Sequence, residues 1–218
     1  MAGRVALITG AGRGIGLSAA KLFLQNNYRV FVSDLNLDKA RQELQSTPSD
    51  RIGFLETDVT KEDQVEAMTQ AALKQFGQVD AAICNAGILS PIVPWLDYID
   101  KMLSVNVKAM RASPSTGKGC SLTFVASVAS LYAYCASKWA VRGLSLTAAA
   151  EFAPYGIRSN CIQPGATATE MFASFPPELQ TAVKDPLEIA QVMLFLAGEQ
   201  SSFMNGSTVA VHGGQTPT

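Results

Sequence analysis

The segment Thr9-Gly10-Ala11-Gly12-Arg13-Gly14-Ile15-Gly16, which directly follows the apolar run Val5-Ala6-Leu7-Ile8, decides the fold. The apolar run predicts a buried strand, and a helical pattern begins at Ile15. The glycines between them allow a tight strand-to-helix turn and let an anion approach the main chain. The amides and the dipole at the start of the helix then favour a phosphate. Alone, such a segment is weak support for a dinucleotide site, because similar turns also serve packing.

An acidic residue further along the chain strengthens this interpretation. Asp34 ends the next apolar run, Val30-Phe31-Val32-Ser33. In a dinucleotide-binding unit, an acid at the end of the second strand accepts hydrogen bonds from the adenosine ribose. A carboxylate would also repel a 2′-phosphate, which favours NAD over NADP. The alternative is that Asp34 caps the helix that follows.

Composition is that of a globular α/β enzyme. The chain has 218 residues, of which 48% are hydrophobic, 8% aromatic and 16% charged. These values indicate a packed core and favour a single domain over residues 1–218 that binds the dinucleotide and carries the catalytic groups. The net charge is −1 and the sequence contains no basic block, so we expect no nucleic-acid partner.

Cysteine usage and the absence of long apolar runs indicate a cytoplasmic protein. The four cysteines show no C-x-x-C spacing and the chain has one histidine, so we expect reduced structural thiols and no metal site. The first strand begins within a few residues of Met1, which leaves no room for a signal peptide. No apolar run approaches the length that spans a membrane, so no membrane association is expected.

Short apolar runs alternate with amphipathic stretches along the whole chain. The predicted strands are Val5–Thr9, Arg29–Asp34, Ile52–Glu56, Ala81–Cys84, Leu122–Ser127, Arg158–Ile162 and Thr208–Val211. The predicted helices are Ile15–Asn26, Asp38–Gln45, Lys61–Phe76, Asp100–Met110, Ala133–Phe152 and Pro186–Ala197. Thr60 with Asp63 predicts a capping box, and Asp185 before Pro186 predicts a second helix start. The pattern indicates an α/β fold: a Rossmann-like, doubly wound parallel sheet of about seven strands with helices on both faces.

Ligands of such sheets bind beyond the carboxyl ends of the strands, which selects the residues that follow each strand. Asp58, after the third strand, could accept from the adenine amino group or cap a helix. Asn85-Ala86-Gly87 follows the fourth strand, where small residues would let the strand end lie against a cofactor. As an isolated tripeptide it is equally typical of a turn.

Tyr134-Cys135-Ala136-Ser137-Lys138 is the second strong signal. On a helix, residues four apart share a face, so the phenol and the ammonium are neighbours. A nearby positive charge favours the phenolate, and we expect it to lower the pKa of Tyr134 and make proton exchange with a substrate feasible. Ser127, at the end of the fifth predicted strand, could hold the same substrate oxygen. Alone, a Tyr/Lys pair at this spacing is usually a surface pair.

Taken together, these motifs make the chain resemble a short-chain dehydrogenase/reductase over nearly its whole length. The resemblance rests on the glycine-rich turn, Asn85-Ala86-Gly87, Ser127, the Tyr134–Lys138 segment and Pro164-Gly165. It implies that Tyr134 is the acid/base, that Ser127 orients the reacting oxygen and that Lys138 binds the nicotinamide ribose. Asn106 matches the position that holds a water in a proton relay. Without the resemblance, Asn106 would be an ordinary polar helix residue and Pro164-Gly165 an ordinary turn.

The resemblance also implies NAD as the cofactor and a small-molecule alcohol or ketone as the substrate, with hydride passing between them. The implied cofactor-binding residues are Gly10, Arg13, Gly14, Ile15, Gly16, Asp34, Asp58, Val59, Asn85, Ala86, Gly87, Tyr134, Lys138, Pro164, Gly165, Thr167 and Thr169. A homotetramer or homodimer is implied as well. Met171, Phe172 and Phe175 fall where the family places its substrate lid, and they favour an uncharged or mostly apolar alcohol or ketone. The alternative is that these side chains pack in the core.

Two intervals are shorter than is usual in this family, one after Asn106 and one between Ser127 and Tyr134. Either these are true deletions that alter the substrate wall, or residues are missing from the recorded chain. Two rival functions follow. A sensor or scaffold could retain the fold and the nucleotide but not turnover, and an NADPH-dependent 3-oxoacyl reductase would share the fold. Asp34 weighs against the second rival.

Overall fold

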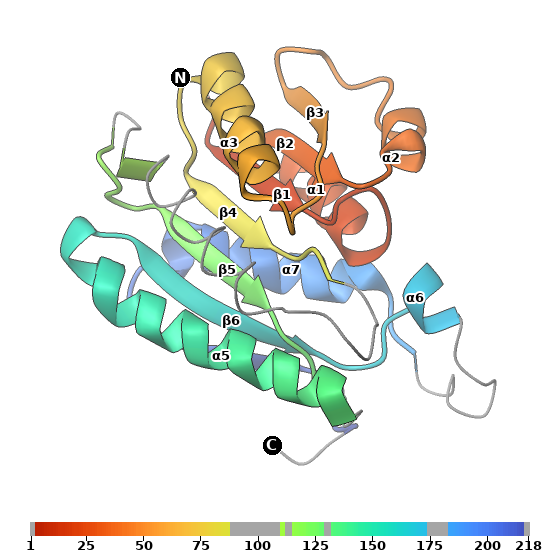
Figure 1. Cartoon of the computed structure of the whole chain (residues 1–218), viewed down its shortest axis with the longest axis vertical. Helices are drawn as coiled ribbons and strands as arrows, with labels where there is room; N and C mark the ends of the chain where they lie inside the picture. Colours follow the sequence, from red (N-terminus) through yellow and green to blue (C-terminus); the bar gives the residue numbers. More distant parts are fainter. Residues whose placement is uncertain (1–2, 88–109, 112–114, 129–131, 174–182, 216–218) are drawn as a thin grey trace.

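A computed structural model describes residues 3–87, 110–111, 115–128, 132–173 and 183–215. Within these ranges the polypeptide forms one seven-stranded sheet in which every neighbouring pair of strands is parallel, in the order β3-β2-β1-β4-β5-β6-β7. The strands are β1 (Val5–Thr9), β2 (Arg29–Asp34), β3 (Ile52–Glu56), β4 (Ala81–Cys84), β5 (Ser121–Val125), β6 (Arg158–Pro164) and β7 (Thr208–Val211). Strand order reverses between β1 and β4 (Figure 1). In sheets of this kind ligands bind beyond the carboxyl ends of the strands at such a reversal, so a ligand is expected there.

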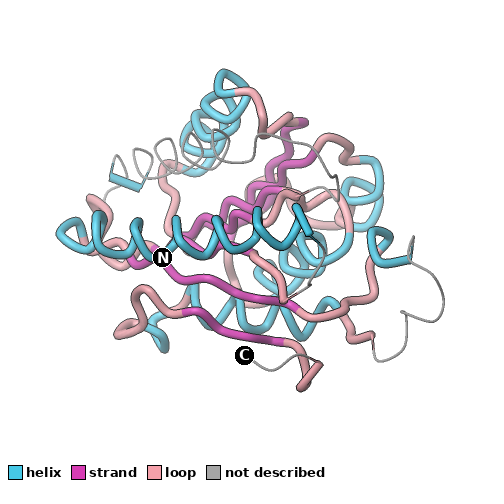
Figure 2. The backbone as a smooth tube through the Cα atoms, turned by 60° about the horizontal axis from the view of Figure 1, so that its bottom comes forward, coloured by secondary structure: helices cyan, strands magenta, loops and turns pink. Residues whose placement is uncertain are grey.

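Helices cover both faces of the sheet (Figure 2). They are α1 (Gly14–Gln25), α2 (Asp38–Glu43), α3 (Glu62–Phe76), α5 (Tyr132–Phe152), α6 (Glu170–Ala173) and α7 (Pro186–Ala197), with the 3₁₀ helices η1 (Ala153–Tyr155) and η3 (Glu199–Ser201). Buried residues of α3 and α5 pack on one face, and those of α1 and α7 on the other. The predicted fold class is therefore confirmed.

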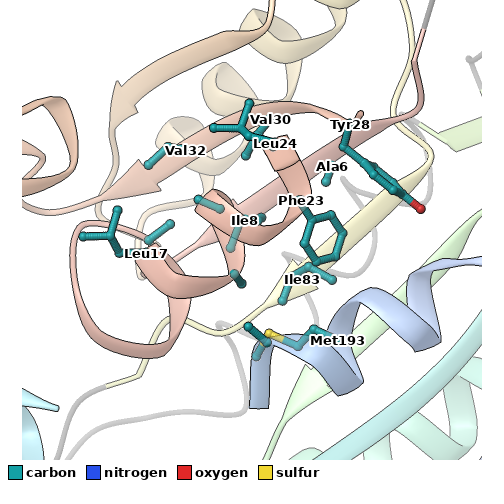
Figure 3. Packing of buried hydrophobic residues seen from close by; sticks show 14 of the residues in the cluster. Ala6, Ile8, Leu17, Phe23, Leu24, Tyr28, Val30, Val32, Ile83 and Met193 are labelled. Atoms are coloured by element: carbon teal, nitrogen blue, oxygen red, sulfur yellow. The ribbon is translucent and has the colours of Figure 1, made fainter. Parts of the chain in front are cut away.

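Alternation along the strands explains the two cores. In β1, Leu7 belongs to the core under α3 and α5, whereas Ala6 and Ile8 belong to the core under α1 and α7. Figure 3 shows Phe23 of α1 and Met193 of α7 on the second face, near Ile83 of β4. Strands buried on both sides read as continuous apolar runs, which is why the sequence predicts them well.

Several predicted boundaries differ from the structure. The fifth strand is Ser121–Val125 and so ends two residues before Ser127. The capping box predicted at Thr60 is wrong: α3 begins at Glu62 after Lys61, which makes no side-chain cap, and the Thr60 hydroxyl donates to Asp58 instead. The Asp185 cap is confirmed, because its carboxylate accepts from the Leu187 amide at 2.8 Å. Of the predicted helix 100–110, only Met110 lies within the described residues.

The cysteines are all free thiols, and Cys84, Cys120 and Cys161 are buried. Among the residues that the structure describes, none of the helices combines the length and apolar character needed to cross a bilayer.

Candidate active site

The glycine-rich turn joins β1 to α1 and is built around Asp34. The main-chain amide of Gly12 donates to the Asp34 carboxylate at 2.8 Å. A Cβ at residue 12 would lie 2.2 Å from the carbonyl oxygen of Asn36 and 2.8 Å from the Asp34 carboxyl carbon, so only glycine allows this approach. The alternative role of Asp34 as a helix cap is wrong, since α2 is preceded by Leu37. Asp34 thus lies against the turn, at the end of β2.

Asn85, just after β4, stabilises the glycine-rich turn through side-chain hydrogen bonds. Its side-chain amide donates to the carbonyl oxygens of Thr9 and Gly10, both at 3.0 Å. The Ala86 amide donates to the Thr9 hydroxyl at 3.2 Å, and a Cβ at Gly10 would lie 2.7 Å from the Ala86 Cα. The structure therefore assigns Asn85 a supporting contact with the turn that the sequence did not indicate. The one clue available was that an asparagine follows a strand adjacent to β1.

Asp58 and Val59 follow β3 and lie partly buried at the same edge. The Asp58 carboxylate accepts from the amide of Thr60 at 3.0 Å and from its hydroxyl at 2.7 Å. Both bonds lower the pKa of Asp58, and the bond from the Thr60 hydroxyl has the larger effect. The alternative that Asp58 caps a helix is wrong, because its bonds close a turn ahead of α3.

Ser127 and Tyr134 meet beyond β5. The Ser127 side chain is hydrogen-bonded to the Tyr134 phenol. Past the end of β5, the amide of Val128 still donates to the carbonyl oxygen of Pro164 at 3.1 Å, which holds Ser127 beside the end of β6. Tyr134 lies in the first turn of α5. The two elements bring together the hydroxyl and the phenol that the sequence paired.

Lys138 lies one helical turn further along α5 and is buried. Its ammonium nitrogen donates to the carbonyl oxygen of Val125 at 2.9 Å and lies 5.6 Å from the centre of the Tyr134 ring. Burial lowers the pKa of Lys138 to about 8, while the nearby Cys161 thiol acts in the opposite direction. The predicted neighbourhood of phenol and ammonium is thus present.

The pKa of Tyr134 is shifted in the direction opposite to the expected one. Burial raises the pKa of Tyr134 above its usual value of 10, and the hydrogen bond with Ser127 opposes that rise. Desolvation disfavours the charged phenolate, and here it outweighs the hydrogen bond with Ser127. At neutral pH the protein therefore carries Tyr134 as a neutral phenol.

The segment after β6 closes this part of the site. The Gly165 amide donates to the carbonyl oxygen of Val211 at 3.0 Å, and the buried Thr167 hydroxyl donates to the carbonyl oxygen of Gly165 at 2.9 Å. The Ala166 amide donates to the side chain of Gln215 at 2.8 Å. Thr169 directly precedes α6, and its hydroxyl accepts from the Phe172 amide at 3.3 Å.

Because all seven strands run parallel, the predicted groups that lie within the described residues share the carboxyl edge of the sheet. This set comprises the turn 10–16, Asp34, Asp58, Val59, residues 85–87, Ser127, Tyr134, Lys138, Pro164, Gly165, Thr167 and Thr169. Asn106 and Phe175 lie outside the described residues. The predicted oligomer stays a prediction.

Comparison with known proteins agrees with this geometry. The chain is 33% identical over 246 residues to trans-4-hydroxycyclohexanecarboxylate dehydrogenase of Sinomonas cyclohexanicum, covering 99% of this chain and 94% of that protein. It is 34% identical over 248 residues to 3beta-hydroxysteroid dehydrogenase 2 of Eggerthella lenta, covering 98% and 95%. Among solved structures, a 3-ketoacyl-(acyl-carrier-protein) reductase from Brucella melitensis, complexed with NADH, aligns with a TM-score of 0.89 at 28% identity over 99% of both chains.

The alignments with both dehydrogenases run over more positions than the 218 residues of this chain. Each relative therefore has internal residues without a counterpart here, as the short intervals in the sequence suggest.

The family model described as short chain dehydrogenase matches residues 4–180, which include the glycine-rich turn, Ser127, Tyr134 and Lys138. This match, the relatives above 30% identity and the seven-stranded parallel sheet together establish that the chain belongs to the short-chain dehydrogenase/reductase family of oxidoreductases.

Proposed function

We propose that this protein interconverts a secondary alcohol and its ketone with NAD(H), and that the hydroxyl is carried on a ring. The observation that carries the proposal is the Tyr134 phenol, which is hydrogen-bonded to Ser127 and has the buried Lys138 ammonium over its ring. The names of the two dehydrogenase relatives specify a hydroxyl on a cyclohexane ring and on a steroid, which supports the choice of a cyclic alcohol.

The residues at the carboxyl edge fit a nicotinamide dinucleotide. The glycine-rich turn brings main-chain amides to the start of α1, where an anion is favoured. Asp34 would accept from the adenosine ribose and repel a 2′-phosphate, which supports NAD over NADP. Pro164, Gly165, Thr167 and Thr169 would hold the nicotinamide end, beside Lys138. When bound, the nicotinamide supplies the hydride donor or acceptor.

The chain's own groups handle the proton. In ketone reduction, the neutral Tyr134 phenol donates its proton to the substrate oxygen, and the Ser127 hydroxyl holds that oxygen in place. In alcohol oxidation, Tyr134 takes the hydroxyl proton as a phenolate. The Lys138 ammonium, 5.6 Å from the ring centre, stabilises that charge. General acid–base catalysis of this kind contributes about 10²- to 10⁴-fold to the rate.

The test compares Tyr134→Phe with wild type on ring alcohols and their ketones, including hydroxycyclohexanecarboxylates and 3-hydroxysteroids. NADH formation or consumption is followed by absorbance. We expect wild type to turn over, the variant to lose at least about 100-fold in kcat, and its NADH affinity to change little. Tyr155→Phe, at a half-exposed tyrosine of η1, serves as the matched control and should retain full activity. Wild-type turnover by Tyr134→Phe would contradict the assignment.

A nucleotide-binding sensor is the second candidate, and the internal residues missing relative to the two dehydrogenases favour it. It predicts NADH binding without turnover on the whole panel. The structural similarity to the Brucella melitensis 3-ketoacyl reductase supports the alternative of a 3-oxoacyl reductase. That structure, however, is a complex with NADH and not with NADPH. Comparing the affinities for NADH and NADPH separates it from the proposed function.

A further inference from the structure

An ion pair joins two elements that are far apart in the sequence, α2 and α6. The ammonium of Lys39 lies 2.5 Å from Oε1 of Glu170. The hydrogen bond between them is the largest cause of both pKa shifts: it raises the pKa of Lys39 and lowers the pKa of Glu170. Both groups are therefore charged at neutral pH. Figure 1 shows α2 and α6 on the same side of the molecule as the start of α1.

The glycine-rich turn lies next to this pair. A Cβ at Gly14 would lie 3.1 Å from the Thr169 methyl carbon and 3.8 Å from the second carboxylate oxygen of Glu170. Arg13 is close enough to contribute to the lowered pKa of Glu170. The Glu170 carboxylate therefore lies over the first residue of α1, where the proposed cofactor would place its diphosphate.

Main-chain bonds anchor the segment that carries Glu170 independently of the ion pair. The Ala168 amide donates to the carbonyl oxygen of Lys184 at 2.8 Å, and the Lys184 amide donates to that of Ala166 at 3.1 Å. The Thr169 hydroxyl fixes the first turn of α6. The side chains of Lys39 and Glu170 are about half exposed, so their ion pair is weak. It can therefore open while the main-chain hydrogen bonds that anchor this segment stay intact.

We propose that Lys39 and Glu170 form a clasp across the glycine-rich turn, and that its opening limits cofactor exchange. The inference rests on the proposed function, since the clasp matters only if a dinucleotide crosses this turn. Lys39 and Glu170 act on the cofactor through their own ion pair. While the pair is closed, a dinucleotide seated between the glycine-rich turn and α6 dissociates more slowly.

The test measures the rate at which NADH leaves the full-length protein, by stopped-flow fluorescence after displacement with excess NAD. Glu170→Gln should release NADH about two- to fivefold faster than wild type, the range expected for an exposed ion pair. Charge alone predicts the opposite sign, because removing a negative charge near a diphosphate should slow its release. Glu43→Gln is the matched control: it breaks the exposed Lys21–Glu43 pair between α1 and α2, makes the same change in net charge, and should leave the rate unchanged.

A charge swap supplies the second readout. Glu170→Lys should lack the clasp, and the double variant Lys39→Glu/Glu170→Lys should restore it and release NADH more slowly than Glu170→Lys alone. Without a clasp, the added negative charge at residue 39 would make the double variant faster. Equal or slower release from Glu170→Gln, with NADH still bound by wild type, overturns the clasp and leaves the proposed function standing. If wild type binds neither NADH nor NADPH, both proposals fall.

Discussion

The ammonium of Lys138 donates to the carbonyl oxygen of Val125 at the end of β5, 2.9 Å away. This bond fixes a charge inside the protein, where only 6% of the residue's surface is exposed. Burial disfavours the charged form and lowers the pKa of Lys138 from its usual 10.5 to about 8. A charge kept at such a cost is typical of a functional group rather than of one selected for stability.

Replacing Lys138 by Met should therefore stabilise the fold while impairing turnover. Below pH 8 the native state pays the full cost of the buried charge, up to about 3 kcal/mol for this shift. Loss of the bond to Val125 offsets part of the gain, so we expect the free energy of unfolding to rise by about 1–3 kcal/mol at pH 7. Urea denaturation measures it, and kcat on the best ring alcohol should fall at least about tenfold.

The pH dependence checks the cause. Between pH 8 and 10.5 the unfolded chain binds the Lys138 proton and the native state does not, so this residue makes wild-type stability rise with pH. The advantage of Lys138→Met should shrink over the same interval. Lys74→Met, at an exposed helical lysine of α3, should show neither the gain nor its pH dependence. A pH-independent gain would refute the explanation by burial of charge.

The sequence predicted the strands within two residues at each end, because apolar runs buried on both sides leave a strong pattern. It also brought Ser127, Tyr134 and Lys138 to one edge. The sequence did not predict contacts between segments that are far apart along the chain. The amide of Asn85 bonds two carbonyl oxygens of the turn, and nothing local to residue 85 indicates them. Lys39 and Glu170 likewise meet only through the fold.

The pKa of Tyr134 shows a second limit. The four-residue spacing between Tyr134 and Lys138 reveals the nearby charge, but it does not reveal how deeply the phenol is buried. The helix places Lys138 beside the ring as expected, yet the packing around α5 removes water from the phenol and reverses the direction of the shift. The start of α3 was missed for a related reason: the Thr60 hydroxyl donates to the carboxylate of Asp58, and the helix begins after Lys61 rather than after Thr60.

Replacing Asp34 by Ser should relax the preference for NADH over NADPH. A carboxylate and a phosphate about 4 Å apart repel by about 4 kcal/mol at an effective dielectric constant of 20. Removing even part of this repulsion should lower the ratio of the NADPH and NADH dissociation constants at least about tenfold. Fluorescence titration measures both without any substrate. Asp38→Asn, in the exposed first turn of α2, should leave the ratio as in wild type, and an unchanged ratio in Asp34→Ser would count against Asp34 as the selective residue.

Replacing Asn85 by Ala should weaken both the fold and cofactor binding. The change removes two bonds to the carbonyl oxygens of Thr9 and Gly10, and we expect a loss of about 1–3 kcal/mol in the free energy of unfolding. NADH should bind several-fold more weakly, because the turn loses its support. Asn26→Ala removes one exposed bond to Leu22 and should cost less than about 1 kcal/mol, with no effect on NADH. Equal losses in the two variants would argue against a special role for Asn85.

Replacing Gly12 by Ala and Gly143 by Ala should change stability in opposite directions. The new methyl group at residue 12 would meet the main chain of Asn36 at 2.2 Å, so the turn must shift away from Asp34. We expect a cost of about 1–3 kcal/mol together with a clear loss of NADH affinity. At residue 143, inside α5, a Cβ meets nothing within 4 Å, and alanine favours the helix by about 0.5–1 kcal/mol. Thermal denaturation and NADH titration of both variants provide the check. If Gly12→Ala binds NADH as wild type does, then the contact between the Gly12 amide and Asp34 is not what shapes the cofactor site.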